Sequence, residues 1–167
     1  MFDRDGTLNY EQQGHHSNLA GLTPYPFAGP LLRDLDAAGY SLAVVTNQSG
    51  VARGLWPLEE VDAMHERFSR EWGVAPSFFI CPHAPADGCS CRKPEPGLLL
   101  RAMAAAHASA GGAMLIGDSL ADLAAADQAG VEFALVLTGR GRATRAQLPS
   151  PPALVLDTVA GLRAYLG

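Results

Sequence analysis

Short apolar runs alternate with helical patterns along this chain, and this alternation restricts the fold more than any other feature. The apolar runs are rich in strand-forming residues, as in strands covered on both faces, and span residues 41–46, 77–81, 113–117, 132–137 and 153–156. The helical patterns lie between and after them and span residues 30–38, 58–72, 96–108, 120–129 and 158–166. The alternation predicts an α/β fold in which a central, mostly parallel sheet is covered by helices.

Length and charge narrow the class of protein. A chain of 167 residues suits one domain, and we expect residues 1–167 to form it. The net charge is -5, with Lys93 the single lysine among 12 basic residues, so no basic stripe for nucleic acid is expected. The longest apolar stretch, residues 97–117, is interrupted by Arg101 and His107, so no membrane span is expected. The first residues lack the apolar core of a secretory signal, which predicts a cytoplasmic protein.

Polar motifs follow the predicted strands. In open parallel sheets, ligands bind beyond the carboxyl ends of the strands. Each motif alone fits an ordinary turn or a helix cap, but at strand ends and in this order the motifs predict one site. The motifs are Asp-Arg-Asp-Gly-Thr at 3–7, Thr-Asn-Gln at 46–48, Arg-Lys-Pro at 92–94 and Gly-Asp-Ser at 117–119.

Over residues 3–122 this order of motifs resembles the haloacid dehalogenase superfamily of aspartate-nucleophile phosphatases. The resemblance implies a Rossmann-like, three-layer domain and Mg²⁺-dependent hydrolysis of a phosphomonoester through an aspartyl-phosphate. It implies that Asp122 supports the site. The remaining roles implied are Asp3 as nucleophile, Asp5 as general acid and base, Thr46 and Asn47 on the phosphoryl oxygens, Gln48 in substrate binding, Lys93 on phosphate and nucleophile, and Asp3, Asp5 and Asp118 on Mg²⁺.

Charge counting supports these roles. Asp3, Asp118 and a phosphate dianion carry four negative charges, while Mg²⁺ and Lys93 supply three positive ones, so the carboxylate can approach the phosphate. The compact ammonium of Lys93 fits between Asp3 and the phosphate better than a planar guanidinium would. Gly6 is expected to turn the chain so that Asp5 faces the leaving group. Crowding by like charge predicts a raised pKa for Asp5, which would let it hold a proton for the leaving oxygen.

A second cluster comprises Cys81, His83, Cys89 and Cys91 and uses every cysteine in the chain. Four soft ligands within a short segment suit tetrahedral Zn²⁺ with no open position, which indicates a structural site. Its role would be to clamp the loop that leads into Arg92 and Lys93. A redox pair at Cys89 and Cys91, or inert thiols, is the alternative.

Residues 3–9, 46–54 and 81–97 together are similar to the zinc-containing branch that holds heptose bisphosphate phosphatases and histidinol-phosphatases. The resemblance implies a small phosphorylated substrate, either a heptose 1,7-bisphosphate in carbohydrate metabolism or histidinol phosphate or another sugar phosphate. Arg53 and Arg92 flank the predicted site and could hold a second phosphate, which favours the bisphosphate. Arg92 could instead only support the zinc loop.

No insertion of the size of a cap domain follows the first or second motif, so loop 10–27 and the zinc loop would alone shield the site. An open site suits hydrolysis better than a mutase, and we expect a monomer.

Three other classes of protein fit the sequence less well. A phospho-accepting receiver domain would place its aspartate after the third strand, where this chain has cysteines. An inactive zinc-bearing module would not need both acidic residues of the first motif, and a polynucleotide 3′-phosphatase is disfavoured by the negative charge.

Further expectations concern residues outside the motifs. No role is assigned to the histidines other than His83, at positions 15, 16, 65 and 107, and the apolar stripe over residues 58–72 is expected in the core. Arg140, Arg142 and Arg145 are expected on a solvated loop and helix face, within possible reach of a remote substrate group. Only Met1 and Phe2 precede Asp3, whereas a central strand usually has about five or six residues, so we expect the start to be trimmed or misassigned.

Overall fold

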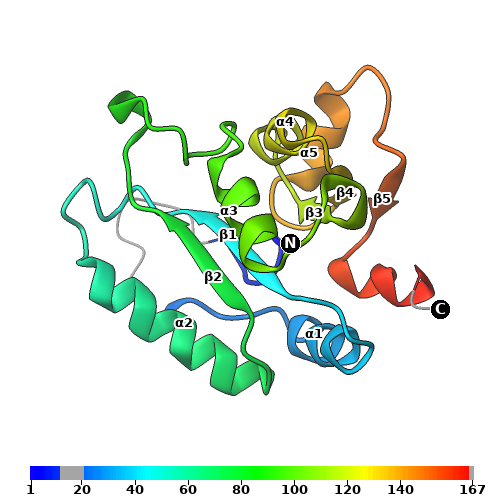
Figure 1. The fold of residues 1–167 in the computed structure, drawn as a ribbon, viewed down its shortest axis with the longest axis horizontal. Helices are drawn as coiled ribbons and strands as arrows, with labels where there is room; N and C mark the ends of the chain where they lie inside the picture. Colours follow the sequence, from blue (N-terminus) through cyan, green and yellow to red (C-terminus); the bar gives the residue numbers. More distant parts are fainter. Residues whose placement is uncertain (12–20, 166–167) are drawn as a thin grey trace.

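The computed structural model describes residues 1–11 and 21–165 and has three layers, with helices on both faces of a parallel sheet (Figure 1). All strand pairs among the described residues are parallel. On one side of the sheet's centre β1 pairs with β2, and on the other side β3, β4 and β5 pair in that order. The strands are β1 Ala43–Asn47, β2 Ser77–Cys81, β3 Met114–Gly117, β4 Glu132–Val136 and β5 Leu154–Leu156. The predicted α/β class and all five predicted strands are therefore confirmed.

The first three residues join the two halves of the sheet. Phe2 bridges to Val44 on β1 and to Ile116 on β3, both in parallel sense. The Phe2 amide donates to Ala43 O at 2.8 Å, and the Asp3 amide donates to Ile116 O at 2.8 Å. The chain start is thus the central strand, and it delivers Asp3 to the carboxyl edge of the sheet.

Helices cover the sheet in two layers. Helices α1 and α2 lie on one face, α1 against the C-terminal 3-10 helix η4, while α3 and α4 lie on the other face (Figure 1). The pattern at 58–72 predicts α2 to the residue, whereas the pattern at 158–166 forms a 3-10 helix over its described part. A short helix, α5, follows β4. It contains Arg142 and Arg145 and begins directly after Arg140, where a loop and a helix face were expected. The bounds are α1 Ala28–Ala37, α2 Leu58–Trp72, α3 Gly97–Ala105, α4 Leu120–Ala129, α5 Gly141–Gln147 and η4 Val159–Tyr165.

The core consists of two apolar clusters, one on each face of the sheet. Phe68 and Trp72 of α2 lie fully in the first cluster, and Leu98 and Leu99 of α3 lie in the second. The prediction that the whole stripe of α2 is buried is wrong at Leu58, which is 38% exposed because it occupies the first turn of the helix. No helix of the described residues is long and apolar enough to cross a membrane.

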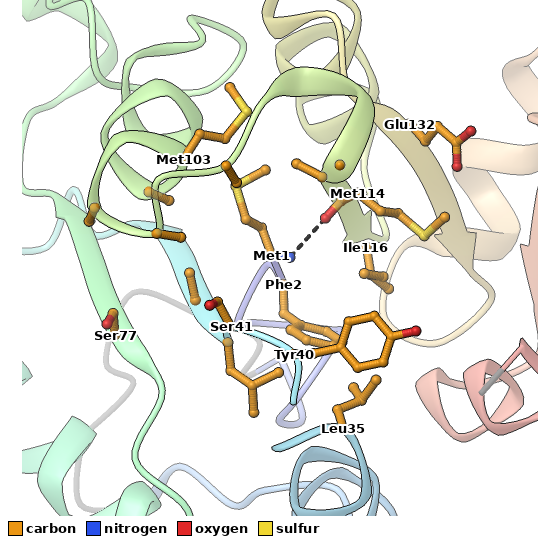
Figure 2. Close-up of a pocket in the computed structure, with 18 of the residues that line it drawn as sticks. Met1, Phe2, Leu35, Tyr40, Ser41, Ser77, Met103, Met114, Ile116 and Glu132 are labelled. Atoms are coloured by element: carbon orange, nitrogen blue, oxygen red, sulfur yellow. Dashed lines mark hydrogen bonds between the residues drawn. The ribbon is translucent and has the colours of Figure 1, made fainter. Parts of the chain in front are cut away.

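A cavity of about 840 Å³ lies at the amino ends of the strands, opposite the edge that carries Asp3 (Figure 2). Its lining includes Met1, Leu42, Met103 and Met114. The Met1 amine donates to Met114 O at 2.8 Å, and burial lowers the pKa of this amine to about 5. The first residues thus occupy the space between β1 and β3 toward the carboxyl edge, and the cavity lies between the amino ends of these two strands.

Candidate active site

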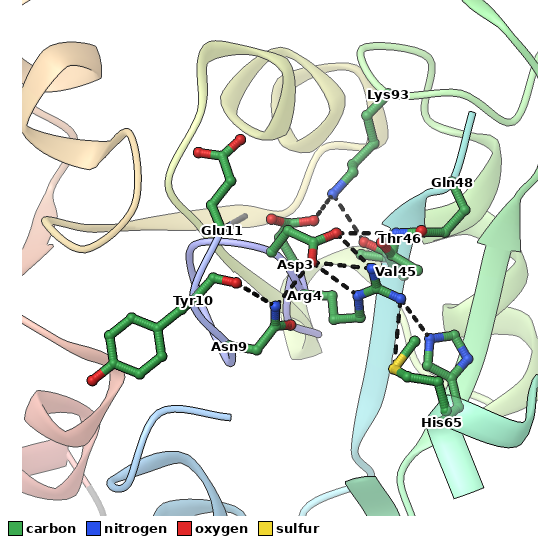
Figure 3. Close-up of polar contacts among 12 residues, drawn as sticks. Asp3, Arg4, Asn9, Tyr10, Glu11, Val45, Thr46, Gln48, His65 and Lys93 are labelled. Carbon is green, nitrogen blue, oxygen red and sulfur yellow. Dashed lines mark hydrogen bonds and ion pairs between the residues drawn. The ribbon is translucent and has the colours of Figure 1, made fainter. Parts of the chain in front are cut away.

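Lys93 connects the acidic residues at the carboxyl edge of the sheet. Its Nζ lies 2.6 Å from Asp3 Oδ1 and donates to Val45 O at 2.9 Å (Figure 3). The same Nζ lies 2.6 Å from Asp122 Oδ1. Lys93 lies in the loop between β2 and α3 and is only 4% exposed. The structure thus brings Asp3 and Lys93, which are 90 residues apart in sequence, into direct contact as predicted.

The environment of this pair is strongly acidic. Burial raises the pKa of Asp3 well above its ordinary value, Lys93 opposes this shift, and Asp122 and Asp118 add to it. Burial alone would lower the pKa of Lys93, but the carboxylates of Asp122 and Asp3 raise it above its ordinary value. Three buried carboxylates therefore face one ammonium, which leaves negative charge that a bound cation would balance.

Asp118 follows β3 and completes a cluster of carboxylates. One oxygen each from Asp3, Asp118 and Asp122 lies within 4.8 Å of the others, and all three residues are buried. Because Asp122 is already held by Lys93 and accepts from Ser119 Oγ at 2.5 Å, Asp3 and Asp118 have the oxygens left for a cation. Oxygen ligands of this kind fit Mg²⁺.

The backbone around Asp118 holds its carboxylate in place. The Arg140 amide donates to Asp118 Oδ2 at 2.7 Å, and Thr144 Oγ1 donates to Asp118 O at 2.7 Å. Burial raises the pKa of Asp118 to about 6; the Arg140 amide opposes this shift, while nearby carboxylates add to it. Gly6 and Gly139 have φ of 83° and 53°, and a Cβ on either would overlap Asp118 Oδ2. Only glycine lets both turns approach this carboxylate.

Asp5 has a different environment from the one expected. Its carboxylate accepts from Arg4 Nη2 at 2.8 Å, Asn9 Nδ2 at 2.9 Å and Gln48 Nε2 at 3.0 Å (Figure 3). Burial tends to raise the pKa of Asp5, but Arg4 and these hydrogen bonds outweigh it, so the pKa lies below its ordinary value. The predicted raised pKa is therefore wrong. The sequence shows acidic neighbours, but not that the Arg4 side chain folds back onto the next residue.

The motif after β1 connects Asp5 and the Lys93 loop. Gln48 Nε2 also donates to Thr46 Oγ1 at 2.8 Å, so Gln48 links Thr46 to Asp5, and the contact of Thr46 with a phosphoryl oxygen stays a prediction. The Asn47 side chain donates to Lys93 O at 3.0 Å and accepts from the Lys93 amide at 3.1 Å. Asn47 therefore aligns the Lys93 backbone, and its contact with a phosphoryl oxygen stays a prediction.

The four predicted zinc ligands converge on one point. The distances are 3.6 Å from Cys81 Sγ to His83 Nδ1, 3.6 Å from Cys81 Sγ to Cys89 Sγ, 3.3 Å from His83 Nδ1 to Cys91 Sγ and 3.5 Å from Cys89 Sγ to Cys91 Sγ. Ligand bonds of about 2.0–2.3 Å in a tetrahedron around Zn²⁺ place neighbouring donor atoms roughly 3.5–3.8 Å apart, so the donor set fits this ion. The three cysteines form no disulfide.

The two predicted substrate-binding arginines lie on loops at the rim. Arg53 is exposed, and its Nη2 donates to Ser49 Oγ at 2.5 Å. Arg92 is half-buried, and its Nη1 donates to His83 O at 3.2 Å. Arg92 thus contacts the zinc loop in this structure, as the alternative interpretation expected. The shielding segment 10–27 lies partly outside the described residues, as do the histidines at 15 and 16.

Arg4, Asn9 and His65 belong to the site but were not predicted. Arg4 is 2% exposed and its guanidinium contacts both Asp5 and His65. The position of Arg4 between two aspartates could have indicated its partner, because a buried cation needs a carboxylate. His65 carries no local signal, because its contact with Arg4 spans 61 positions.

Comparison with known proteins identifies relatives over nearly the whole chain. Residues 90–162 match the HAD-hydrolase-like family model. The D-glycero-β-D-manno-heptose-1,7-bisphosphate 7-phosphatase of Pseudomonas putida is 39% identical over 172 residues, covering 99% of this chain and 97% of that protein. The Pseudomonas aeruginosa protein of the same name is 35% identical over 170 residues, covering 99% and 96%.

A solved structure agrees with this result. The crystal structure of the Bordetella bronchiseptica D,D-heptose 1,7-bisphosphate phosphatase, complexed with magnesium and phosphate, is similar with a TM-score of 0.92 at 35% identity. The similarity covers 99% of this chain and 95% of that one. The motifs at the sheet edge, the fold and these relatives agree: the chain belongs to the D-glycero-D-manno-heptose 1,7-bisphosphate 7-phosphatase family of HAD-like hydrolases.

Proposed function

We propose that this protein is a Mg²⁺-dependent phosphatase that removes the 7-phosphate from D-glycero-D-manno-heptose 1,7-bisphosphate, in the cytoplasm and as a monomer, with residues 1–167 as one phosphatase domain. The observation that carries the proposal is the buried contact of 2.6 Å between Lys93 Nζ and Asp3 Oδ1 at the carboxyl edge of the sheet. A carboxylate paired with an ammonium can approach a phosphate dianion as a nucleophile. The substrate named is the one in the names of the relatives.

The reaction needs two displacements at phosphorus. In the first, an Asp3 oxygen bonds to phosphorus, the bond to the sugar oxygen breaks with its electron pair, and that oxygen takes a proton from Asp5. In the second, water attacks phosphorus, gives a proton to Asp5, and the bond to Asp3 breaks to release phosphate. The ionised state of Asp5 favoured by Arg4 suits it as the base of the second step. The proton that Asp5 gains in the second step replaces the one that it gave to the leaving oxygen, so the cycle balances.

The other residues of the site hold charge and position. Lys93 would contact the transferring phosphoryl group as well as Asp3, and Thr46, Asn47 and Gln48 would bind its oxygens. Asp3 and Asp118 would hold Mg²⁺, which neutralises charge on the phosphoryl oxygens when bound. The Asp5 side chain is not part of the carboxylate cluster, in which Asp122 is the third member.

The zinc cluster would have a structural role. Cys81, His83, Cys89 and Cys91 supply a closed set of four ligands, and no further donor is needed. The segment they would clamp continues directly into Arg92 and Lys93. Zinc would therefore stabilise the loop that presents the ammonium to Asp3.

Phosphate release across a panel of substrates tests the proposal. The panel comprises the heptose bisphosphate, histidinol phosphate and simple sugar monophosphates, each assayed with Mg²⁺. We expect the highest kcat/KM for the heptose bisphosphate. A higher kcat/KM for histidinol phosphate would overturn the substrate assignment, and absence of phosphate release from every ester would overturn the proposed activity.

A further inference from the structure

Arg4 is a buried cation whose nitrogens all have acceptors. Nε and Nη2 face the Asp5 carboxylate at 3.2 Å and 2.8 Å, and Nη1 lies 3.2 Å from His65 Nε2 and 3.9 Å from Met64 Sδ. The Arg4 side chain is only 3% exposed, so water cannot replace a missing acceptor. The orientation of the guanidinium therefore depends on His65 on one side and on Asp5 on the other.

His65 is built to accept this hydrogen bond. It lies on α2, is 3% exposed, and its ring stacks on Phe78 with centroids 4.1 Å apart and an interplanar angle of 10°. Burial, and secondarily the charge of Arg4, lower the pKa of His65 to about 3. A neutral imidazole can carry its proton on Nδ1 and leave the Nε2 lone pair for Arg4. The stack on Phe78 fixes the plane of the ring.

We propose that His65 is a positioning residue for the reaction, which acts on Asp5 through Arg4. The Nε2 acceptor fixes the Arg4 guanidinium, and the fixed guanidinium aims the Asp5 carboxylate at the ester oxygen. Without that acceptor, Nη1 is a buried donor with no strong partner, and Arg4 turns to find one. Asp5 then moves with it, and small displacements of a proton donor are costly to the rate.

This inference rests on the proposed function, in which Asp5 protonates the leaving oxygen. Two ester types separate positioning of Asp5 from general damage. A sugar alkoxide needs the proton from Asp5, whereas p-nitrophenolate leaves readily without one. The ratio of the two kcat/KM values is therefore a measure of Asp5 function, and it does not depend on what fraction of a preparation is folded.

Two variants of His65 and one control test the proposal. His65→Phe keeps an aromatic ring against Phe78 but removes the acceptor, whereas His65→Gln restores an acceptor oxygen. Met64→Leu removes the weaker sulfur contact from the adjacent position of α2. We expect His65→Phe to lower kcat/KM for the sugar phosphate by roughly 10–100-fold and to change that for p-nitrophenyl phosphate by less than about 3-fold. His65→Gln and Met64→Leu should keep the wild-type ratio within about 3-fold.

Equal losses on both esters in His65→Phe would overturn the inference, as would failure of His65→Gln to restore the ratio. The sugar phosphate used is whichever one the wild type hydrolyses, so a wrong heptose assignment leaves this test intact. A wild type that hydrolyses no phosphate ester would overturn both the proposed function and this inference.

Discussion

At the scale of single residues, the side chains that contact a carboxylate, and not its position in the sequence, determine its pKa. Asp3 and Asp5 are two positions apart, yet their pKa values shift in opposite directions. Asp3 is buried among other carboxylates with one ammonium beside it, whereas Asp5 is surrounded by the donors of Arg4, Asn9 and Gln48. Burial among carboxylates therefore raises the pKa of Asp3, whereas a set of hydrogen-bond donors lowers the pKa of Asp5.

Arg92 carries the first prediction, which concerns the remote phosphate. If Arg92 binds it, Arg92→Ala removes a charged hydrogen bond worth about 1.5–3 kcal/mol and lowers kcat/KM for the bisphosphate roughly 10–150-fold. Steady-state kinetics on the bisphosphate and on a matched monophosphate measure this, with the monophosphate much less affected. Similar losses on both substrates would assign Arg92 to the zinc loop, through its bond to His83 O.

His65 carries the second prediction, which concerns stability against pH. Its pKa falls from 6.5 to about 3 on folding, so the unfolded chain binds a proton that the folded protein excludes. The contribution of neutral His65 to the free energy of unfolding is fully present above pH 6.5 and is lost as pH falls toward 3. We expect the wild type to lose about 2 kcal/mol more than His65→Gln in free energy of unfolding between pH 7 and pH 5. Urea titrations at both values measure it, and parallel losses would contradict the pKa shift.

At the scale of elements, we expect the loop between β2 and α3 to depend on a bound zinc ion. Cys81 is buried at the end of β2, and the segment from His83 to Cys91 contains one short 3-10 helix, Pro85–Asp87. Because few side chains of this loop are packed, a bound zinc ion would supply the stability that packing does not provide.

The third prediction is that purified protein carries about one equivalent of zinc per chain. Cys89→Ser or chelation should lower Tm by roughly 5 °C or more and lower activity, because the loop that bears Lys93 loosens. Elemental analysis with thermal unfolding measures both, and the exposed Ser90→Ala is not a ligand change and serves as the control. Freshly reduced protein that is fully active without zinc would contradict the assignment.

The fourth prediction concerns the central strand. A designed extension of a few β-branched residues before Met1 should enter the cavity of about 840 Å³ between β1 and β3 and raise Tm. A gain of about 2 kcal/mol from buried apolar surface corresponds to roughly 4–8 °C. The extension also replaces the buried amine, whose pKa falls from 8.0 to about 5 on folding, so stability is lost as pH falls below 8.

The gain should therefore be larger at pH 6 than at pH 9. Thermal unfolding at both pH values checks this against a Gly-Ser extension of equal length, which adds no apolar surface. An equal Tm for the two extensions would mean that the cavity does not receive the strand.

At the scale of the whole molecule, local patterns predict the sheet well because each strand is apolar and short. The predicted run 77–81 and the helix at 120–129 agree with β2 and α4 to the residue. The convergence of the three cysteines with His83, and the Asp3–Lys93 contact, were predictable because their motifs stand at or follow strand ends. The contact of Arg4 with Asp5 was not predictable, because the direction of the Arg4 side chain depends on His65 of α2, which is distant in sequence.

Chemical trapping of the phosphorylated residue tests most directly whether Asp3 is the nucleophile. Wild-type enzyme turning over the heptose bisphosphate is quenched in acid and reduced with borohydride, and the peptides are sequenced by mass spectrometry. Reduction of an acyl phosphate converts the modified aspartate into homoserine. We expect homoserine at position 3 alone, and none in Asp3→Asn, which should retain the fold and release no phosphate. Phosphate release by Asp3→Asn, or homoserine at another aspartate, would contradict the role of Asp3 as nucleophile.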